Sequence, residues 1–157
     1  MPIQVAVCGP RATTDLLDTH AREVGKLLAQ AGATLLCGGG TGVMAAAADG
    51  AFTAGGLVIG IRPDTDRTAI CPGLTAVIYT NMGEARNSIL IESADAVIVV
   101  GGSWGTLSEL ALAHRRGGIP VISLGGWTIH DETGTPIPIS TAETPSAAVE
   151  LALSEHH

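Results

Sequence analysis

The chain has 157 residues, of which 46% are apolar, 15% charged and 3% aromatic, and its formal net charge is −7. This length matches one ordinary domain, so we expect a single domain over residues 1–157. The apolar fraction excludes general disorder. No apolar stretch reaches the roughly 20 residues of a membrane helix, so we expect no membrane partner. The first residues predict a strand rather than a signal peptide, which favours a cytoplasmic location.

The acidic charge also bears on possible partners. Eight Lys and Arg residues against fifteen Asp and Glu residues do not supply the clustered cationic face that a phosphate backbone requires, so we expect no nucleic acid partner. The cysteines Cys8, Cys37 and Cys71 are odd in number and widely spaced, which matches neither a disulfide framework nor a zinc pattern. We therefore expect reduced cysteines and no metal site, and we assign no role to His156 and His157.

Short aliphatic runs alternate along the chain with longer helical patterns, and glycines stand at most junctions. This alternation predicts an α/β fold, a Rossmann-like doubly wound and mainly parallel sheet with helices on both faces. In chain order, the expected elements are a strand at 3–8, a helix opened by Thr13 or Thr14 and closed by Gly32, a strand at 33–37, a helix at 43–53, strands at 57–61 and 75–79, a helix from Asn81 to Ser93, a strand at 96–100, a helix ending at Arg116, a strand at 120–124 and a helix at 145–153.

Several local signals define the ends of these elements. Asn81 is expected to cap its helix with Glu84 as the reciprocal partner. Thr144 and the following proline are expected to open the last helix. Residues 62–73 show no periodicity and predict a loop, and residues 127–140 predict a hairpin with its turn at 132–134.

Two glycine-rich segments, residues 38–42 and 101–106, each follow an expected strand and open an expected helix. Unpaired N–H groups and the positive end of the helix dipole converge there, which stabilises an anion. Neither segment has the lysine of a Walker A motif or the register of a dinucleotide-binding fingerprint, which disfavours a nucleoside triphosphatase or an NAD dehydrogenase. Tight turns alone would also use these glycines, but two such segments favour a phosphate site.

Arg86 and Glu109 are expected to lie on helices that flank the same strand. Arg86 falls on an apolar stripe with Met82 and Leu90, where a guanidinium needs a carboxylate or a phosphate as partner. Contact with a ligand is one interpretation of this pair. The alternatives are a structural salt bridge or a solvent-reaching side chain for Arg86, and a capping box with Thr106 for Glu109.

Residues 82–87 (MGEARN), followed by residues 100–109 (VGGSWGTLSE), resemble the paired arginine and P-G-G-x-G-T-x-x-E signatures of the LOG family. This family comprises cytokinin riboside 5′-monophosphate phosphoribohydrolases, formerly described as lysine decarboxylase-like. Residues 38–44 resemble the glycine loop that precedes these signatures in the family, one residue shorter. The resemblance implies hydrolysis of the N-glycosidic bond of a nucleoside 5′-monophosphate.

The resemblance also implies roles for individual residues. Thr106 and residues 102–105 would hold the 5′-phosphate, Glu109 would support an oxocarbenium-like transition state and the attack of water, and Arg86 would orient that carboxylate. The implied catalytic residues are therefore Arg86 and Glu109. The expected ligand-binding residues are Gly9, Gly39, Gly40, Thr41, Gly42, Met82, Asn87, Gly101, Gly102, Ser103, Gly105 and Thr106.

The chain departs from the LOG pattern at Asn87, where the family has lysine, and at Val100, where it has proline. These departures resemble a shorter branch that includes molybdenum-cofactor carrier proteins, which bind a phosphorylated pterin without turnover. Two functions therefore stay open. The first is binding of a phosphorylated nucleotide-like molecule with hydrolysis, for which no cofactor is required. The second is carriage of the molybdenum cofactor as a bound ligand. The resemblance implies a homodimer in either case.

Overall fold

The computed structural model describes residues 1–154, so His156 and His157 lie outside the described residues. One seven-stranded sheet has the order β4-β3-β2-β1-β5-β6-β7, and every neighbouring pair is parallel. The strands are β1 (Gln4–Cys8), β2 (Thr34–Cys37), β3 (Val58–Arg62), β4 (Ala76–Tyr79), β5 (Ala96–Val100), β6 (Val121–Leu124) and β7 (Ser140–Ala142). The predicted parallel α/β sheet is confirmed.

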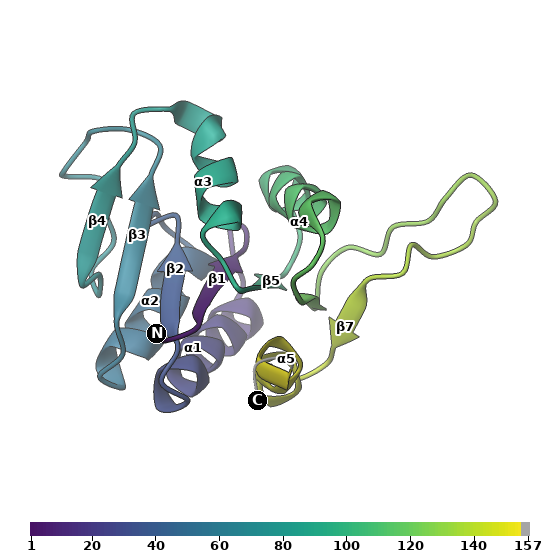
Figure 1. The fold of residues 1–157 in the computed structure, drawn as a ribbon, viewed down its shortest axis with the longest axis horizontal. Coiled ribbons are helices and arrows are strands. Elements are labelled where there is room, and N and C mark those ends of the chain that lie inside the picture. The colour runs from purple at the N-terminus through teal and green to yellow at the C-terminus, as the bar shows by residue number, and fades with distance from the viewer. Residues whose placement is uncertain (155–157) are drawn as a thin grey trace.

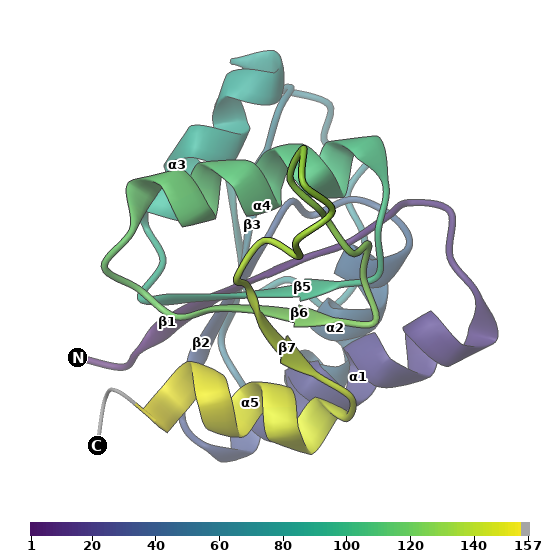
Figure 2. The same cartoon turned by 90° about the vertical axis from the view of Figure 1, so that its right-hand side faces the viewer.

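The helices cover both faces of this sheet (Figures 1 and 2). One face carries α1 (Asp15–Gln30), α2 (Val43–Thr53) and α5 (Pro145–Leu153). The other carries α3 (Arg86–Glu92) and α4 (Trp104–Arg116). No helix within residues 1–154 is both long and apolar enough to cross a bilayer.

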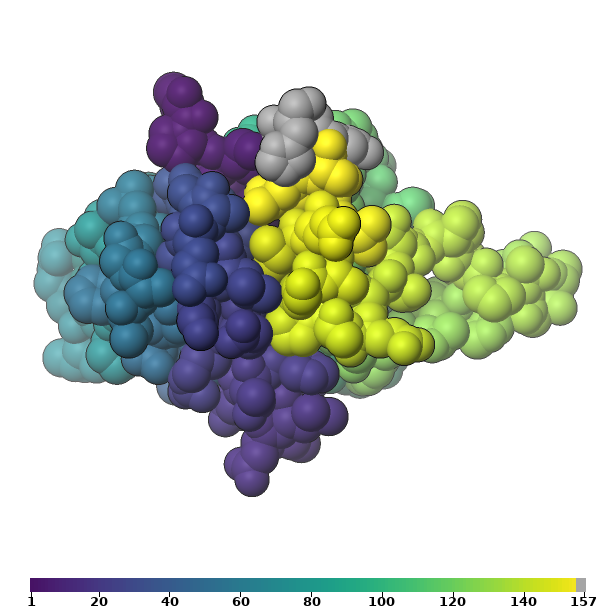
Figure 3. Space-filling model, turned by 90° about the horizontal axis from the view of Figure 1, so that it is seen from below, coloured from purple at the N-terminus to yellow at the C-terminus, as the bar shows by residue number. Residues whose placement is uncertain are grey.

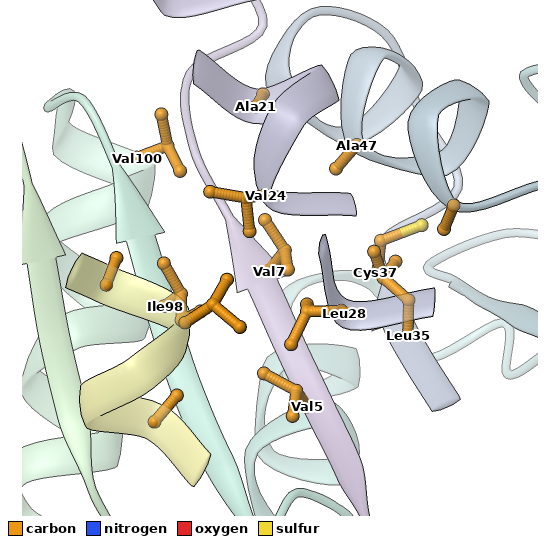
Figure 4. Close-up of a cluster of buried hydrophobic side chains, with 14 of the residues drawn as sticks. Val5, Val7, Ala21, Val24, Leu28, Leu35, Cys37, Ala47, Ile98 and Val100 are labelled. Carbon is orange, nitrogen blue, oxygen red and sulfur yellow. The ribbon is translucent and has the colours of Figure 1, made fainter. Parts of the chain in front are cut away.

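Each strand supplies side chains to two cores, because successive residues of a strand point to opposite faces. In β1, Val5 and Val7 belong to the cluster under α1, α2 and α5, which Figure 4 shows. Ala6 and Cys8 belong to the cluster under α3 and α4. Cys8, the last residue of β1, therefore lies on the α4 side of the sheet.

Two glycines bring α1 and α2 unusually close together. A Cβ on Gly25 of α1 would collide with the Ala47 carbonyl of α2, and a Cβ on Gly50 of α2 would collide with the Arg22 carbonyl of α1. Larger residues at either position would force the helices apart. On the same face α5 packs beside α1, as the view from below in Figure 3 shows.

Residues 125–139 leave the end of β6 as an arm that projects beyond the sheet before the chain returns as β7 (Figures 1 and 3). The predicted hairpin is confirmed as a short one: the Asp131 carboxylate accepts the amides of Thr133 and Thr135 in the turn, and the Asp131 and Ile137 amides donate to the carbonyls of Thr135 and Ile129 across it. The two limbs share a single antiparallel bridge, between His130 and Pro136. The sequence did not predict β7, because its residues Ser-Thr-Ala lack strand-like alternation.

Most predicted element ends lie within about a residue of the observed ones, but the start of α3 does not. The Asn81 cap is wrong. Asn81 adopts φ +50° and is followed by a 3₁₀ turn at Gly83–Ala85, which precedes α3. The Gly83 amide donates to the Pro63 carbonyl, so a loop contact, rather than a capping side chain, sets this helix entry. Thr14 and Thr144 do cap α1 and α5.

Candidate functional site

A cavity of about 680 Å³ opens beyond the carboxyl ends of β1, β2 and β5. The chain order reverses between β1 and β5, which is where open parallel sheets bind ligands. The cavity is lined by Gly9, Pro10, Arg11, Ala12, Gly38, Met44, Glu84, Arg86, Asn87, Leu90, Gly102, Ser103, Trp104, Gly105, Thr106, Glu109 and Trp127.

The structure brings together many, but not all, of the residues expected at the site. Those that line the cavity are Gly9, Arg86, Asn87, Gly102, Ser103, Gly105, Thr106 and Glu109. Those that lie outside its lining are Gly39, Gly40, Thr41, Gly42, Met82 and Gly101. The second glycine segment therefore contributes four of these eight residues, and none of the residues expected from the first segment line the cavity.

The N-terminus of α4 faces this cavity. Ser103 is its N-cap and accepts the Thr106 amide at 3.2 Å, while the hydroxyls of Ser103 and Thr106 lie 2.9 Å apart. The amides of Trp104 and Gly105 come before the first intrahelical hydrogen bond, and they have no protein acceptor within the described part of the chain. Together with the helix dipole, they make the mouth of α4 suited to an anion.

The first glycine segment is closed by the protein itself. The Val43 amide at the start of α2 donates to the Pro10 carbonyl at 3.1 Å. Gly42 has φ +73°, and a Cβ there would collide with the carbonyls of Pro10 and Arg11. Gly42 therefore makes room for the loop after β1, whose Pro10 carbonyl accepts an amide that an anion would accept at an open helix terminus.

Arg86 is buried and held mainly by backbone. Its Nη1 donates to the carbonyls of Gly38 at 3.0 Å and Ile61 at 2.8 Å. Its Nε is buried without a hydrogen-bond partner among the described residues. Burial lowers the pKa of Arg86, and the nearby Glu109 opposes that shift. A Cβ on Gly38 would lie 2.5 Å from Nη1, so glycine at that position is what admits the guanidinium.

Glu109 lies one turn inside α4 with its carboxyl group in the cavity wall. The capping-box interpretation is wrong, because Ser103 and not Thr106 opens the helix, which leaves Glu109 too far along to cap it. Burial raises the pKa of Glu109, while the Cys8 thiol, which donates to the carboxylate, and the charge of Arg86 oppose this. Within residues 1–154, Arg86 and Glu109 do not form an ion pair within 4.0 Å.

Two cavity residues that sequence reasoning missed are Trp104 and Trp127. Their rings lie edge to face, with centroids 5.2 Å apart and planes at 87°. Trp104 lies inside the second glycine segment, and this position could have indicated that it lines the cavity. Trp127 comes from the arm, and nothing local to it indicated the cavity. Arg11, which also lines the wall, belongs to the loop after β1 in which only Gly9 was selected.

Comparison with known proteins identifies the family of this chain. The SLOG cluster4 family model matches residues 2–150. The chain belongs to the SLOG cluster4 family. This SLOG protein is 33% identical over 128 residues to the cytokinin riboside 5′-monophosphate phosphoribohydrolase of Mycobacterium tuberculosis, a match that covers 76% of this chain and 68% of that protein.

Two solved structures, of a molybdenum cofactor binding protein and of a Moco carrier protein, match nearly the whole of the SLOG chain. The molybdenum cofactor binding protein of the phototrophic bacterium Rippkaea orientalis has a TM-score of 0.88 and 33% identity, covering 100% of this chain and 99% of that one. The Moco carrier protein of Chlamydomonas reinhardtii has a TM-score of 0.83 and 31% identity, covering 99% of each chain. These similarities confirm the resemblance to the LOG family and to the carrier branch.

Proposed function

We propose that this protein binds a phosphorylated, nucleotide-like small molecule in the cavity, with the phosphate against the N-terminus of α4. The observation that carries the proposal is the pair of unpaired amides of Trp104 and Gly105 at the wall of a cavity of about 680 Å³. Pockets for small ligands span about 300–1,000 Å³. Gly102, Ser103 and Thr106 complete the expected phosphate cradle.

We propose carriage without turnover as the leading role, with the molybdenum cofactor, a phosphorylated pterin, as cargo. Support comes from the carrier structures, which match nearly every residue of both chains. Arg86 supports an anionic ligand in either role, because it lines the cavity, its Nη1 is committed to two carbonyls and its Nε is a buried donor without a partner among the described residues. A group of that kind favours an anionic ligand.

Titration calorimetry under anaerobic conditions tests the carrier role. We expect saturable binding of molybdenum cofactor, recovery of the intact ligand by mass spectrometry after incubation, and weaker binding by Thr106→Ala. Flat titrations with molybdenum cofactor and with AMP would remove the proposal. Recovery of a cleaved ligand would remove the claim of carriage without turnover.

Hydrolysis is the second candidate, and Glu109 is the observation that favours it. A carboxylate in the cavity wall, buried enough to raise its pKa, can stabilise positive charge that develops on a ribose ring. The similarity to the mycobacterial phosphoribohydrolase supports the same role. Asn87 lies in this wall, where the LOG signature has lysine.

Chromatography of free base released from AMP and from cytokinin riboside 5′-monophosphate decides the enzyme candidate. We expect Glu109→Gln to abolish release and Asn87→Lys to increase it. An absence of base at high protein concentration, with the wild type and with Asn87→Lys alike, would eliminate hydrolysis.

The remaining proposals concern the protein's surroundings. We propose a homodimer, which light scattering at several concentrations tests by measuring the molecular mass.

The three cysteines are free, which fits a reducing compartment such as the cytoplasm. The net charge of −7 supports the absence of a nucleic acid partner. In a gel-shift assay at low salt, we therefore expect the protein to leave the mobility of single-stranded DNA unchanged.

A further inference from the structure

Two exposed indole rings form a part of the cavity wall that phosphate binding leaves unexplained. Trp104 is 78% exposed and Trp127 is 45% exposed, although large aromatic side chains gain most from burial. They are the only tryptophans in the chain. Both line the cavity, and the two rings contact each other. A chain with only 3% aromatic residues therefore presents both of its largest rings to one space.

The local structure fixes where each indole ring lies. Trp104 is the first residue of α4, directly beside the unpaired amide of Gly105. Trp127 packs on Gly102, where a Cβ would collide with the indole ring. The absence of a side chain at position 102 therefore has two effects: it lets the backbone approach a phosphate, and it leaves room for the indole ring of Trp127.

The perpendicular arrangement gives this wall a definite shape. With planes at 87° and centroids 5.2 Å apart, the indoles form a corner rather than a parallel slot. A flat ring can stack on one indole while its edge meets the other, which satisfies the preference of aromatic pairs for stacked and edge-to-face contacts.

We propose that the Trp104–Trp127 corner binds the planar ring of the ligand and selects phosphorylated bicyclic nitrogen heterocycles, purines or pterins, over other phosphorylated molecules. This inference rests on the proposed function, because the phosphate at α4 holds the attached ring beside Trp104. A sugar phosphate without a ring satisfies the amides and leaves both indoles exposed to water. Stacking of a base on an aromatic side chain changes affinity by about 5- to 150-fold.

The two tryptophans also report on the site, because every tryptophan signal of the protein comes from this wall. Fluorescence and calorimetry are measured with AMP, 6-hydroxymethylpterin monophosphate, ribose 5-phosphate and inorganic phosphate. Trp104→Ala removes one exposed ring, Trp104→Phe keeps a smaller one, and Phe52→Ala is the matched control. Phe52 is 51% exposed on α2, outside the cavity lining.

We expect AMP or the pterin phosphate to quench fluorescence and to bind about 5- to 150-fold more tightly than ribose 5-phosphate. Trp104→Ala should weaken the ring ligands far more than it weakens ribose 5-phosphate, Trp104→Phe should keep part of the difference between them, and Phe52→Ala should keep all of it. Which of the two ring ligands binds more tightly distinguishes a purine from a pterin.

Two results would overturn the inference. Ribose 5-phosphate that binds as tightly as both ring ligands, or equal weakening of all ligands by Trp104→Ala, removes ring selection and leaves phosphate binding in place. Failure of every phosphorylated probe to bind removes both ring selection and the proposed function.

Discussion

Gly105→Ala is expected to raise stability and to weaken ligand binding. Gly105 is the second residue of α4, its φ is not positive, and an added Cβ would meet nothing within 4 Å. Replacing a helical glycine by alanine stabilises a helix by about 0.5–1 kcal/mol, because the unfolded chain loses freedom. The urea midpoint of Gly105→Ala should therefore rise above that of the wild type.

Binding should change in the opposite direction. A phosphate oxygen must approach the α4 amides to about 2.8 Å, and a methyl group on Gly105 adds bulk beside that approach. Loss of one hydrogen bond to a charged group costs about 1.5–3 kcal/mol, which corresponds to an affinity about 10- to 150-fold weaker in calorimetry. Ser108→Ala, on α4 but outside the cavity lining, should gain stability and keep its affinity. If Gly105→Ala binds the ligand as tightly as the wild type, the phosphate does not bind at the N-terminus of α4. If Gly105→Ala is less stable than the wild type, the space beside Gly105 is not open to a methyl group.

Three further substitutions test the structural reasoning by urea unfolding. Arg86→Met leaves the carbonyls of Gly38 and Ile61 without a donor and should lower the free energy of unfolding by about 3 kcal/mol, with a smaller loss for Arg86→Lys; an unchanged midpoint contradicts this. Burial raises the pKa of Glu109, so the folded state holds the proton more tightly, and stability should fall as pH rises through that pKa. Glu109→Gln should therefore be more stable than the wild type at neutral pH and equal to it at about pH 3, below the ordinary pKa; a constant difference at every pH argues against it. Gly50→Ala should lose about 1–3 kcal/mol, because its methyl collides with the α1 backbone. A gain like that of Gly105→Ala would show that α1 and α2 separate freely.

Local signals were enough to predict the fold. The alternation of strands and helices, the caps at Thr14 and Thr144, and the alanine-rich run of α2 depend on neighbours within a few residues. The start of α3 failed because the contact that sets it, between Gly83 and the Pro63 carbonyl, joins residues in separate loops.

The candidate site was predictable only in part, because the two glycine segments look alike in the sequence and differ in tertiary structure. The loop after β1 places the Pro10 carbonyl on the α2 terminus, whereas the Trp104 and Gly105 amides of the second segment meet no carbonyl within residues 1–154. Trp127 was not predictable, since its place at the cavity depends on the path of the arm and on Gly102. Cys8 was expected only to be reduced, and its interaction with Glu109 depends on β1 and α4 meeting on the same face of the sheet.

Trp127 belongs both to the projecting arm and to the cavity wall, so it couples the position of the arm to ligand binding in the cavity. The same indole lines the main cavity and a second one of about 420 Å³, whose other walls are mostly arm residues, with Ser123 of β6 and Thr141 and Ala142 of β7. If a ligand binds more tightly when the arm holds Trp127 in place, then the ligand must stabilise that arm position by the same factor. A contact that restrains the arm would then alter ligand affinity without touching the sheet.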